Sequence, residues 1–178
     1  GAHPNLIPVL GRLEAHPEAT EGLAMALIDS GFRCLAGPPS LESCTRDIYP
    51  AGTRFTPEPA LAIARGIASA AAHLHGRGIL HGDLYAHNIL HCGQGRVLLG
   101  DFGAASCVPP HDRQAAEALQ RIELRAFGCL LEELLAACDE ADRSSPALQP
   151  LAALQARCLT DSPDSRPLLA EVVQALAG

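Results

Sequence analysis

Three side chains that carry oxygen donors lie on two segments of the sequence joined by a short hairpin. Asp83 and Asn88 belong to the run ILHGDLYAHNIL at 79–90, and Asp101 opens the triplet DFG at 101–103. A carboxylate can take the proton of an attacking hydroxyl group, whereas an amide and a second carboxylate match the oxygen ligands of Mg²⁺. The pattern therefore fits the chemistry of phosphoryl transfer.

Two interpretations of this pattern are open from the residue types alone. In the first, the Asp and Asn side chains only cap the turns of a hairpin, which is a common use of both residues. In the second, the two loops act together. A His-x-Asp-x4-Asn loop followed by Asp-Phe-Gly, each bounded by apolar strand-like runs, is specific enough to favour the second interpretation.

The two segments resemble the protein kinase catalytic loop, in which His-Arg-Asp is followed by Asn five residues after the Asp, and the kinase Asp-Phe-Gly triplet. The resemblance implies that ATP and Mg²⁺ are the cofactors, with Asp83 as the catalytic base and with Asn88 and Asp101 as the metal ligands. It gives supporting structural roles to His81, Phe102 and Gly103.

The catalytic loop departs from the kinase pattern at three positions. Gly82 replaces the usual Arg, which in many kinases binds a phosphorylated activation loop, so control by that phosphate is not expected. Tyr85 replaces a phosphate-contacting Lys, and His87 stands where some tyrosine kinases carry Arg. No cation in the loop is therefore assured. His-Gly-Asp also resembles aminoglycoside phosphotransferase-type small-molecule kinases, which leaves the substrate class open.

The resemblance covers nearly the whole chain and divides it into two parts. Residues 1–28 correspond to remnant strands of the N-terminal lobe and the hinge, and 29–178 to the C-terminal lobe. The chain begins with Gly-Ala rather than Met and contains no lysine, since all 13 basic residues are Arg. The kinase strand lysine is thus absent from this chain. We expect a piece of a longer protein that is weak or inactive alone.

The adenine site implied by the resemblance lies on the hinge. An apolar run at 20–28 predicts a strand, as does the run within 1–12, and Met25 would occupy the gatekeeper position. Leu90 would form the floor under the adenine. The backbone groups facing the adenine edge would belong to Ala26, Leu27 and Ile28.

Helical periodicity predicts the rest of an α+β, mainly α fold with short β-hairpins at the active site. Thr56 and Pro57 fit the start of a helix that runs to about residue 74. The helical spacing of Ile63, Ile67, Ala71 and Leu74 predicts one buried stripe on it. A second helix at 122–138 carries apolar residues on nearly every face, which predicts a buried central helix. The activation segment is assigned to 104–121. Two last helices are predicted at 150–159 and 167–176.

Three charged residues of the C-terminal half have structural roles in the resemblance. Glu123 stands where kinases carry an Asp that hydrogen-bonds the backbone of the catalytic loop. Arg166 belongs to an Arg-Pro element, and Glu117 is the remnant of an Ala-Pro-Glu motif. We predict an ion pair between Arg166 and Glu117, or another acidic residue if the remnant is misassigned.

Composition excludes several classes of protein. A net charge of −7 without a basic run argues against nucleic-acid binding. No apolar run reaches membrane-spanning length and no signal-peptide pattern is present, so no membrane partner and a cytoplasmic location are expected. Seven scattered cysteines without a Cys-x-x-Cys pair are interpreted as reduced residues of the core.

The sequence therefore predicts an ATP-dependent phosphotransferase, most simply a protein kinase of the Ser/Thr type with a protein substrate. A pseudokinase that acts as an interaction scaffold and a small-molecule kinase are the alternatives. The Arg- and Ala-rich composition and the His-Gly-Asp variant favour a bacterial branch. A link to leucine-rich repeats elsewhere is a further conjecture, because no repeat is visible in this chain.

Overall fold

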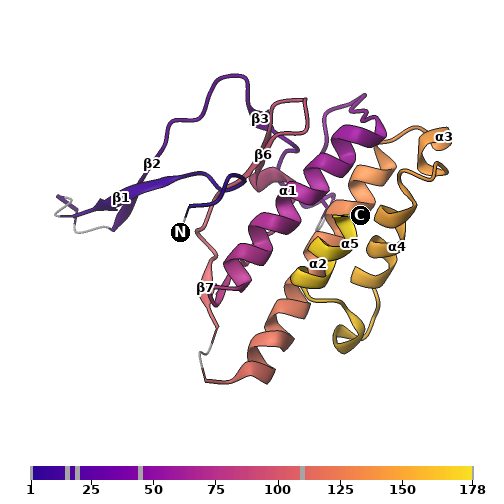
Figure 1. Cartoon of the computed structure of the whole chain (residues 1–178). Coiled ribbons are helices and arrows are strands. Elements are labelled where there is room, and N and C mark those ends of the chain that lie inside the picture. Colours follow the sequence, from indigo (N-terminus) through magenta and orange to yellow (C-terminus); the bar gives the residue numbers. More distant parts are fainter. Residues whose placement is uncertain (1, 15–16, 19–20, 44–45, 109–110, 178) are drawn as a thin grey trace.

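A computed structural model describes residues 2–14, 17–18, 21–43, 46–108 and 111–177. Helices dominate and the strands are short, which confirms the α+β, mainly α class (Figure 1). The elements are β1 Val9–Leu13, β2 Gly22–Met25, β3 Arg33–Cys34, α1 Pro57–His75, β4 Ile79–Leu80, a 3₁₀ turn Ala86–Asn88, β5 Ile89–His91, β6 Val97–Leu99, β7 Ser106–Cys107, α2 Arg113–Ala136, α3 Glu140–Arg143, α4 Gln149–Cys158, a 3₁₀ turn Pro163–Ser165 and α5 Leu169–Leu176.

Helix α1 has the predicted bounds to within one residue. Thr56 takes the N-cap position with extended backbone, although its side chain makes no capping hydrogen bond, and Pro57 opens the helix. The buried stripe of α1 is the predicted one, and its members are Ile63, Ile67, Ala71 and Leu74. No described helix has both the length and the apolar character needed to cross a bilayer.

Helix α2 begins nine residues before the predicted central helix, so the boundary at 122 was wrong. The side chain of Asp112 accepts a hydrogen bond of 2.9 Å from the N–H of Ala115 and caps a helix that starts at Arg113. The following residues, QAAEALQ, are strong helix formers. The predicted activation segment 104–121 therefore contains two turns of α2, and only residues 104–112 precede the helix.

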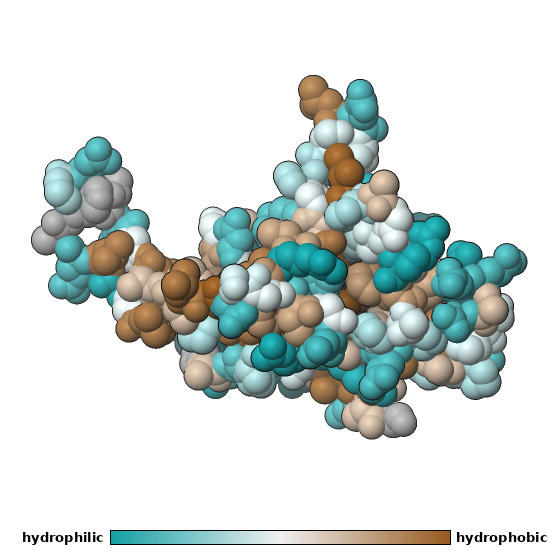
Figure 2. All heavy atoms as spheres, turned by 90° about the horizontal axis from the view of Figure 1, so that it is seen from above, coloured by the Kyte–Doolittle hydropathy of each residue, from teal (hydrophilic) through white to brown (hydrophobic). Residues whose placement is uncertain are grey.

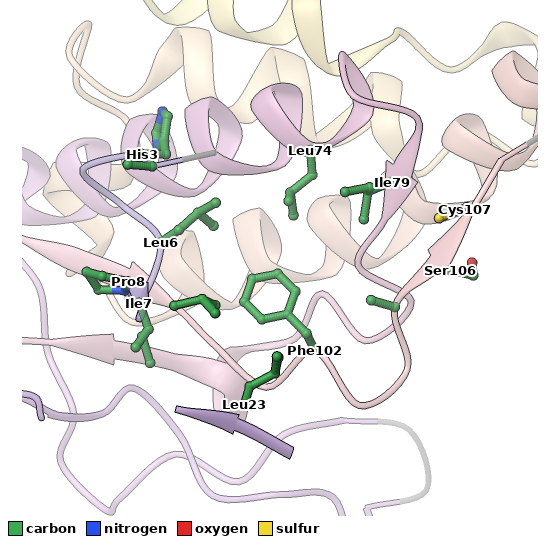
Figure 3. A pocket seen from close by; sticks show the side chains of 13 residues that line it. His3, Leu6, Ile7, Pro8, Leu23, Leu74, Ile79, Phe102, Ser106 and Cys107 are labelled. Atoms are coloured by element: carbon green, nitrogen blue, oxygen red, sulfur yellow. The ribbon is translucent and has the colours of Figure 1, made fainter. Parts of the chain in front are cut away.

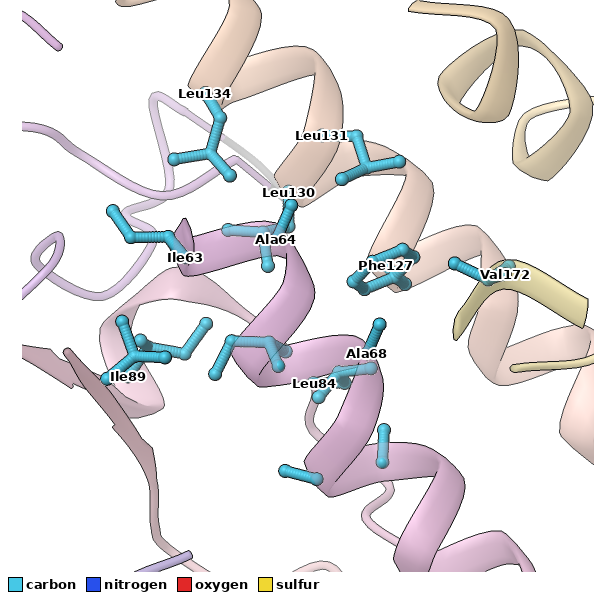
Figure 4. Packing of buried hydrophobic residues seen from close by; sticks show 14 of the residues in the cluster. Ile63, Ala64, Ala68, Leu84, Ile89, Phe127, Leu130, Leu131, Leu134 and Val172 are labelled. Carbon is cyan, nitrogen blue, oxygen red and sulfur yellow. The ribbon is translucent and has the colours of Figure 1, made fainter. Parts of the chain in front are cut away.

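The core lies between α1, α2 and α5 (Figure 4). Phe127 of α2 is fully buried and lies between Ala68 of α1 and Val172 of α5. On the neighbouring face α2 packs closely on α4. A Cβ atom at Gly128 would lie 2.8 Å from the Cβ of Cys158, so this crossing requires glycine. Burial is confined to one broad face of α2 rather than covering nearly all of it.

Short strands bring the active-site segments together. The sheet β3-β5-β6 is antiparallel, and Leu6 adds to it beside Leu99. Strand β4 pairs with β7, which joins the start of the catalytic loop to the segment after the Asp-Phe-Gly triplet. The two strands predicted near the N-terminus form a hairpin, β1–β2, that projects from the body as an arm with apolar side chains (Figures 1 and 2).

The expectation that the cysteines are residues of the core is wrong for part of the set. The six cysteines in the described part of the chain are free. Cys138 and Cys158 are buried, whereas Cys34 and Cys107 are exposed because they lie on two-residue strands at the molecular surface. Cys44 lies outside the described residues.

The burial of Phe127 gives the first prediction. Phe127→Ala removes a fully buried ring and leaves a cavity between three helices, so we expect a loss of about 3–5 kcal/mol in the free energy of unfolding. Urea unfolding followed by circular dichroism measures it. Ile122→Ala on the same helix is the control, because that side chain is 59% exposed, and a comparable loss there would contradict the assigned helix face.

Candidate active site

Asp83 and Asn88 contact each other directly. The catalytic loop leaves β4 at Leu80 and ends in the 3₁₀ turn that carries Asn88. The Asn88 Nδ2 donates to the Asp83 Oδ2 at 2.8 Å and to the backbone oxygen of Asp83 at 2.9 Å. The Oδ1 of Asn88 is left for another ligand. In the described part of the chain no hydrogen bond reaches the Asp83 Oδ1, and the side chain is 38% exposed.

His81 joins the catalytic loop to the Asp-Phe-Gly segment. Its Nε2 lies 2.8 Å from the carbonyl oxygen of Gly100, and its Nδ1 lies 3.3 Å from the backbone nitrogen of Asp83. The ring centroids of His81 and Phe102 are 5.2 Å apart. The predicted support of the loop by His81 and Phe102 is therefore present as contacts.

Asp101 has an unusual backbone conformation. Its φ is +53°, in the left-handed region that costs energy for a residue with a Cβ. Its Oδ1 accepts a hydrogen bond of 3.1 Å from the N–H of Gly103, which stabilises the turn. Gly103 does not adopt a positive φ, because the left-handed residue of this turn is Asp101.

The donor atoms at this site suit a hard cation such as Mg²⁺. The Asn88 Oδ1 and the exposed Asp101 carboxylate are oxygen donors, and Mg²⁺ is commonly held by one or two carboxylates together with substrate phosphates. Among the described residues no group of three or more His, Cys, Asp or Glu side chains is arranged to hold a metal ion.

Gly82 is required by its surroundings. Its φ is +80°, and a Cβ there would lie 2.2 Å from the carbonyl oxygen of Ala104. The catalytic loop thus touches the segment after Gly103 backbone to backbone. The absence of the usual kinase Arg at this position has a steric reason.

The backbone N–H of Gly82 is bound by a side chain of α2. The Glu123 Oε1 accepts from the N–H of Gly82 at 2.6 Å, which agrees with the contact predicted for Glu123. The Glu123 Oε2 lies 2.6 Å from the Nε2 of His75, and both side chains are buried. Burial raises the pKa of Glu123, but the hydrogen bonds from His75 and from the N–H groups of Gly82 and His81 outweigh it and lower the pKa below its ordinary value.

His87 lies between two carboxylates. Its Nδ1 is 2.8 Å from the Asp47 Oδ1, and its Nε2 is 3.4 Å from the Asp83 Oδ2. The backbone N–H of His87 donates to the Asp47 Oδ2 at 2.9 Å. Burial lowers the pKa of His87, but the contacts with both Asp residues prevail and raise it.

Arg166 does not pair with Glu117, so this prediction was wrong, and no other carboxylate takes that place within the described residues. The buried Arg166 guanidinium donates to the carbonyl oxygens of Thr160, Asp161 and Arg121 at 3.0–3.3 Å. Glu117 lies instead on the early turns of α2, where its carboxylate contacts the Arg113 Nε at 2.8 Å.

Comparison with known proteins agrees with this geometry. Residues 3–120 match the protein kinase domain family. The chain belongs to this family. It is 26% identical over 153 residues to a probable serine/threonine-protein kinase of Arabidopsis thaliana, covering 75% of this chain and 25% of that protein. It is 31% identical over 110 residues to the serine/threonine-protein kinase DCLK2 of Rattus norvegicus, covering 60% and 12%.

The chain thus spans a quarter or less of the length of these relatives. Its family membership rests on the segment that contains the catalytic loop and the Asp-Phe-Gly triplet. The bacterial branch and the leucine-rich repeats remain predictions.

The residues predicted to form the hinge line a cavity that no residue of the catalytic loop lines. Ala26, Leu27 and Ile28 line a cavity of about 610 Å³ with Phe32 and Arg96. The Ala26 N–H donates to the carbonyl oxygen of Pro8, so it is not available to an adenine ring. Met25 and Leu90 line none of the three cavities described here, and their nucleotide contacts remain predictions.

Two other cavities flank the catalytic loop. An apolar one of about 520 Å³ lies between the N-terminal segment and α1, with the Phe102 ring at its wall (Figure 3). A more polar one of about 660 Å³ lies between the loop and α2, beside Tyr85 and Arg125. Neither is lined by Asp83, Asn88 or Asp101.

Sequence reasoning missed Asp47 and the role of His75. Asp47 lies 40 residues before His87 in an irregular segment, where no periodicity or motif indicates a contact. The position of His75 in the last turn of α1 predicts only a cation favoured by the helix dipole. One signal for its pairing with Glu123 was available in the sequence. Each residue lies on a helix that is predicted to pack in the core, where a histidine and an acidic residue need a polar partner.

The steric reason for Gly82 is tested by adding a methyl group. Gly93 has the same φ of +80°, and a Cβ added there has no atom within 4 Å. We therefore expect Gly93→Ala to lower the free energy of unfolding by about 1–2 kcal/mol, from backbone strain alone. Gly82→Ala meets the Ala104 carbonyl as well, and we expect a further loss of about 1–3 kcal/mol. Urea unfolding of both variants measures the difference. Equal losses would show that the contact with Ala104 is not restrictive.

The lowered pKa of Glu123 predicts a dependence of stability on pH. The unfolded chain takes up a proton at Glu123 before the folded chain does, so the stabilisation is present at neutral pH and is lost as the pH falls below about 4.5. Glu123→Gln should lose about 1–3 kcal/mol at pH 7, because its neutral amide pairs less well with His75 and the Gly82 amide. Its stability should also fall less steeply between pH 5 and pH 3.

Urea unfolding at several pH values measures this effect, with Glu140→Gln as the matched control because Glu140 is exposed on α3. Parallel pH profiles for wild type and Glu123→Gln would rule out the linkage.

Proposed function

We propose that this protein is an ATP-dependent phosphotransferase that moves the γ-phosphoryl group of ATP to a hydroxyl group, most simply a protein kinase of the Ser/Thr type. The observation that carries the proposal is the pairing of Asp83 with Asn88. The Asn88 amide nitrogen binds one carboxylate oxygen of Asp83, and the other oxygen stays open to an incoming hydroxyl group. The named relatives are serine/threonine-protein kinases, which supports the same class.

In this mechanism Asp83 would orient the acceptor hydroxyl group and take its proton as the oxygen attacks the γ-phosphorus. The bond between that phosphorus and the β–γ bridging oxygen would break, and ADP would leave. Asn88 holds Asp83 through Nδ2 and turns its own Oδ1 away from that contact. Glu123 and His81 accept hydrogen bonds from the backbone N–H groups of Gly82 and Asp83 and so fix the loop at these two residues. The protein's contribution is thus mainly the positioning of groups that are already hydrogen-bonded.

The Asn88 Oδ1 and the Asp101 carboxylate would hold Mg²⁺, whose contribution when bound is to neutralise charge on the phosphates. The turn at Asp101, closed by the Gly103 N–H, leaves its second carboxylate oxygen available. ATP as the donor and a protein as the acceptor follow from the family.

An interaction scaffold without activity is the second candidate. It is favoured by the short segment of nine residues, 104–112, between Gly103 and α2, which offers little surface for a peptide.

Asp83→Asn separates the two candidates. We expect it to lower transfer of phosphate from Mg-ATP by about 10²–10⁴-fold, because the proton acceptor is lost, while Mg-ATP binding changes little. Asp101→Asn should weaken Mg-ATP binding itself. Radiolabelled phosphate transfer and calorimetry on the full-length protein encoded by the gene measure the two effects.

Glu140→Gln is the control, since this acidic residue is exposed on α3. A wild-type protein that bound no Mg-ATP and transferred no phosphate would contradict the phosphotransferase and leave the scaffold. Transfer to a sugar or aminoglycoside, with no peptide labelled, would replace the protein substrate by a small molecule.

A further inference from the structure

We propose that the polar cavity between the catalytic loop and α2 binds the acceptor, and that this acceptor is a peptide with an acidic residue that pairs with Arg125. The inference deepens the proposed function and rests on it, because it names the substrate class for the same catalytic loop. It makes Arg125 a specificity-determining residue, while the chemical step stays that of the proposed function.

The cavity lies beside the segment that carries the catalytic base. Its lining includes Gly82 and Leu84, the residues on either side of Asp83, and continues along the loop to Tyr85. Its volume of about 660 Å³ is within the range of sites that bind small ligands. A molecule that fills this cavity therefore touches the loop on both sides of Asp83, where an acceptor hydroxyl group is needed.

Helix α2 forms the opposite wall with one side of its first half. Four lining residues are three or four positions apart and so lie on the same side of the helix, namely Leu119, Ile122, Ala126 and Cys129. Leu119 is 38% exposed and Ile122 is 59% exposed. Large apolar side chains that are gathered at an exposed cavity favour an apolar group of a partner.

This wall exists because α2 begins at Arg113. Leu119 belongs to the turns that precede the predicted start of the central helix at residue 122. The segment 104–112 is too short to offer much surface to a peptide, and the added turns of α2 supply such a surface next to the catalytic loop.

Most charged side chains of the cavity are already paired. Glu123 contacts His75 and a backbone N–H of the catalytic loop. Arg46 forms ion pairs with Glu132 and Glu133. A ligand could use these groups only by breaking existing contacts, so the remaining groups decide which ligand the cavity prefers.

Three polar side chains of the lining remain available. In the described part of the chain, neither the Arg125 guanidinium nor the Asp161 carboxylate takes part in a hydrogen bond or an ion pair. The Tyr85 hydroxyl group also makes no hydrogen bond to a described residue. Arg125 and Tyr85 can both donate, and only Asp161 is restricted to accepting. This balance favours an anionic group on the acceptor.

An acidic peptide satisfies both walls of the cavity. A guanidinium binds a carboxylate through two parallel N–H···O bonds, which are stronger than neutral hydrogen bonds. An apolar side chain of the same peptide can pack on Leu119 and Ile122. A basic peptide or a cationic aminoglycoside would instead face the charge of Arg125, which has no carboxylate partner among the described residues to offset it.

The test uses degenerate peptides with a central serine, in which one flanking position at a time is fixed as Glu, Gln or Lys. With Mg-ATP, the full-length wild type should phosphorylate peptides with Glu at one of these positions about 5–20-fold faster than those with Lys. Arg125→Gln should abolish the preference, and Arg125→Glu should reverse it in favour of Lys. A reversal distinguishes a direct contact from a loss of folding.

Arg157→Gln is the matched control for these variants. Arg157 is exposed in the last turn of α4 and does not line the cavity. This variant should keep the wild-type preference for Glu, because it removes the same charge from a position that the peptide does not reach.

Ile122→Ser tests the apolar wall. We expect it to raise the KM for the preferred peptide about 3–10-fold and to change the KM for ATP less than about 2-fold, because only the acceptor touches this side of α2. Leu13→Ser is the control, since Leu13 is 50% exposed on β1 and lies outside the cavity. Steady-state phosphate transfer measures both variants.

A wild type that prefers Lys, or that shows no preference, would overturn the inference, as would a preference for Glu that survives in Arg125→Glu. An unchanged KM for the peptide in Ile122→Ser would overturn the role of the α2 wall. Transfer to a small molecule with no peptide labelled would overturn the peptide acceptor. These outcomes differ from failure of the proposed function, in which wild type transfers phosphate to no acceptor at all.

Discussion

The buried carboxylate of Glu123 is the contact on which the active-site geometry depends. It joins three elements, because it accepts from the Gly82 N–H of the catalytic loop and contacts His75 at the end of α1 while belonging to α2. A charged group that is buried among apolar helices is stable only when its oxygens are satisfied. These contacts therefore fix the position of the catalytic loop on the helical core, and with it the position of Asp83.

The parts of the fold that could be predicted from the sequence are those with a local signal. The stripe of Ile63, Ile67 and Leu74 defined α1, and the cap at Pro57 defined its start. The start of α2 was not predicted, because the resemblance assigns residues 113–121 to the activation segment although they are strong helix formers. Asp112 at the cap was the local signal that the expectation concealed.

The candidate site shows the same division. Asp83 and Asn88 lie five residues apart on the same loop, so their proximity was predictable. The Arg166 contacts were not, because a guanidinium bound by backbone carbonyls leaves no complementary residue type in the sequence. Asp47 could not be predicted for a related reason, since its partner lies 40 residues away and Asp47 itself lies in an irregular segment with no periodicity.

The hairpin β1–β2 has a practical consequence for anyone who handles the protein. Leu10 of β1 is 70% exposed and Leu23 of β2 is 53% exposed, and the two strands pair only with each other among the described elements. Open strand edges that carry apolar side chains favour self-association as concentration rises. Light scattering over a dilution series should therefore precede any kinetic work. Replacing Leu10 by a charged residue should reduce self-association.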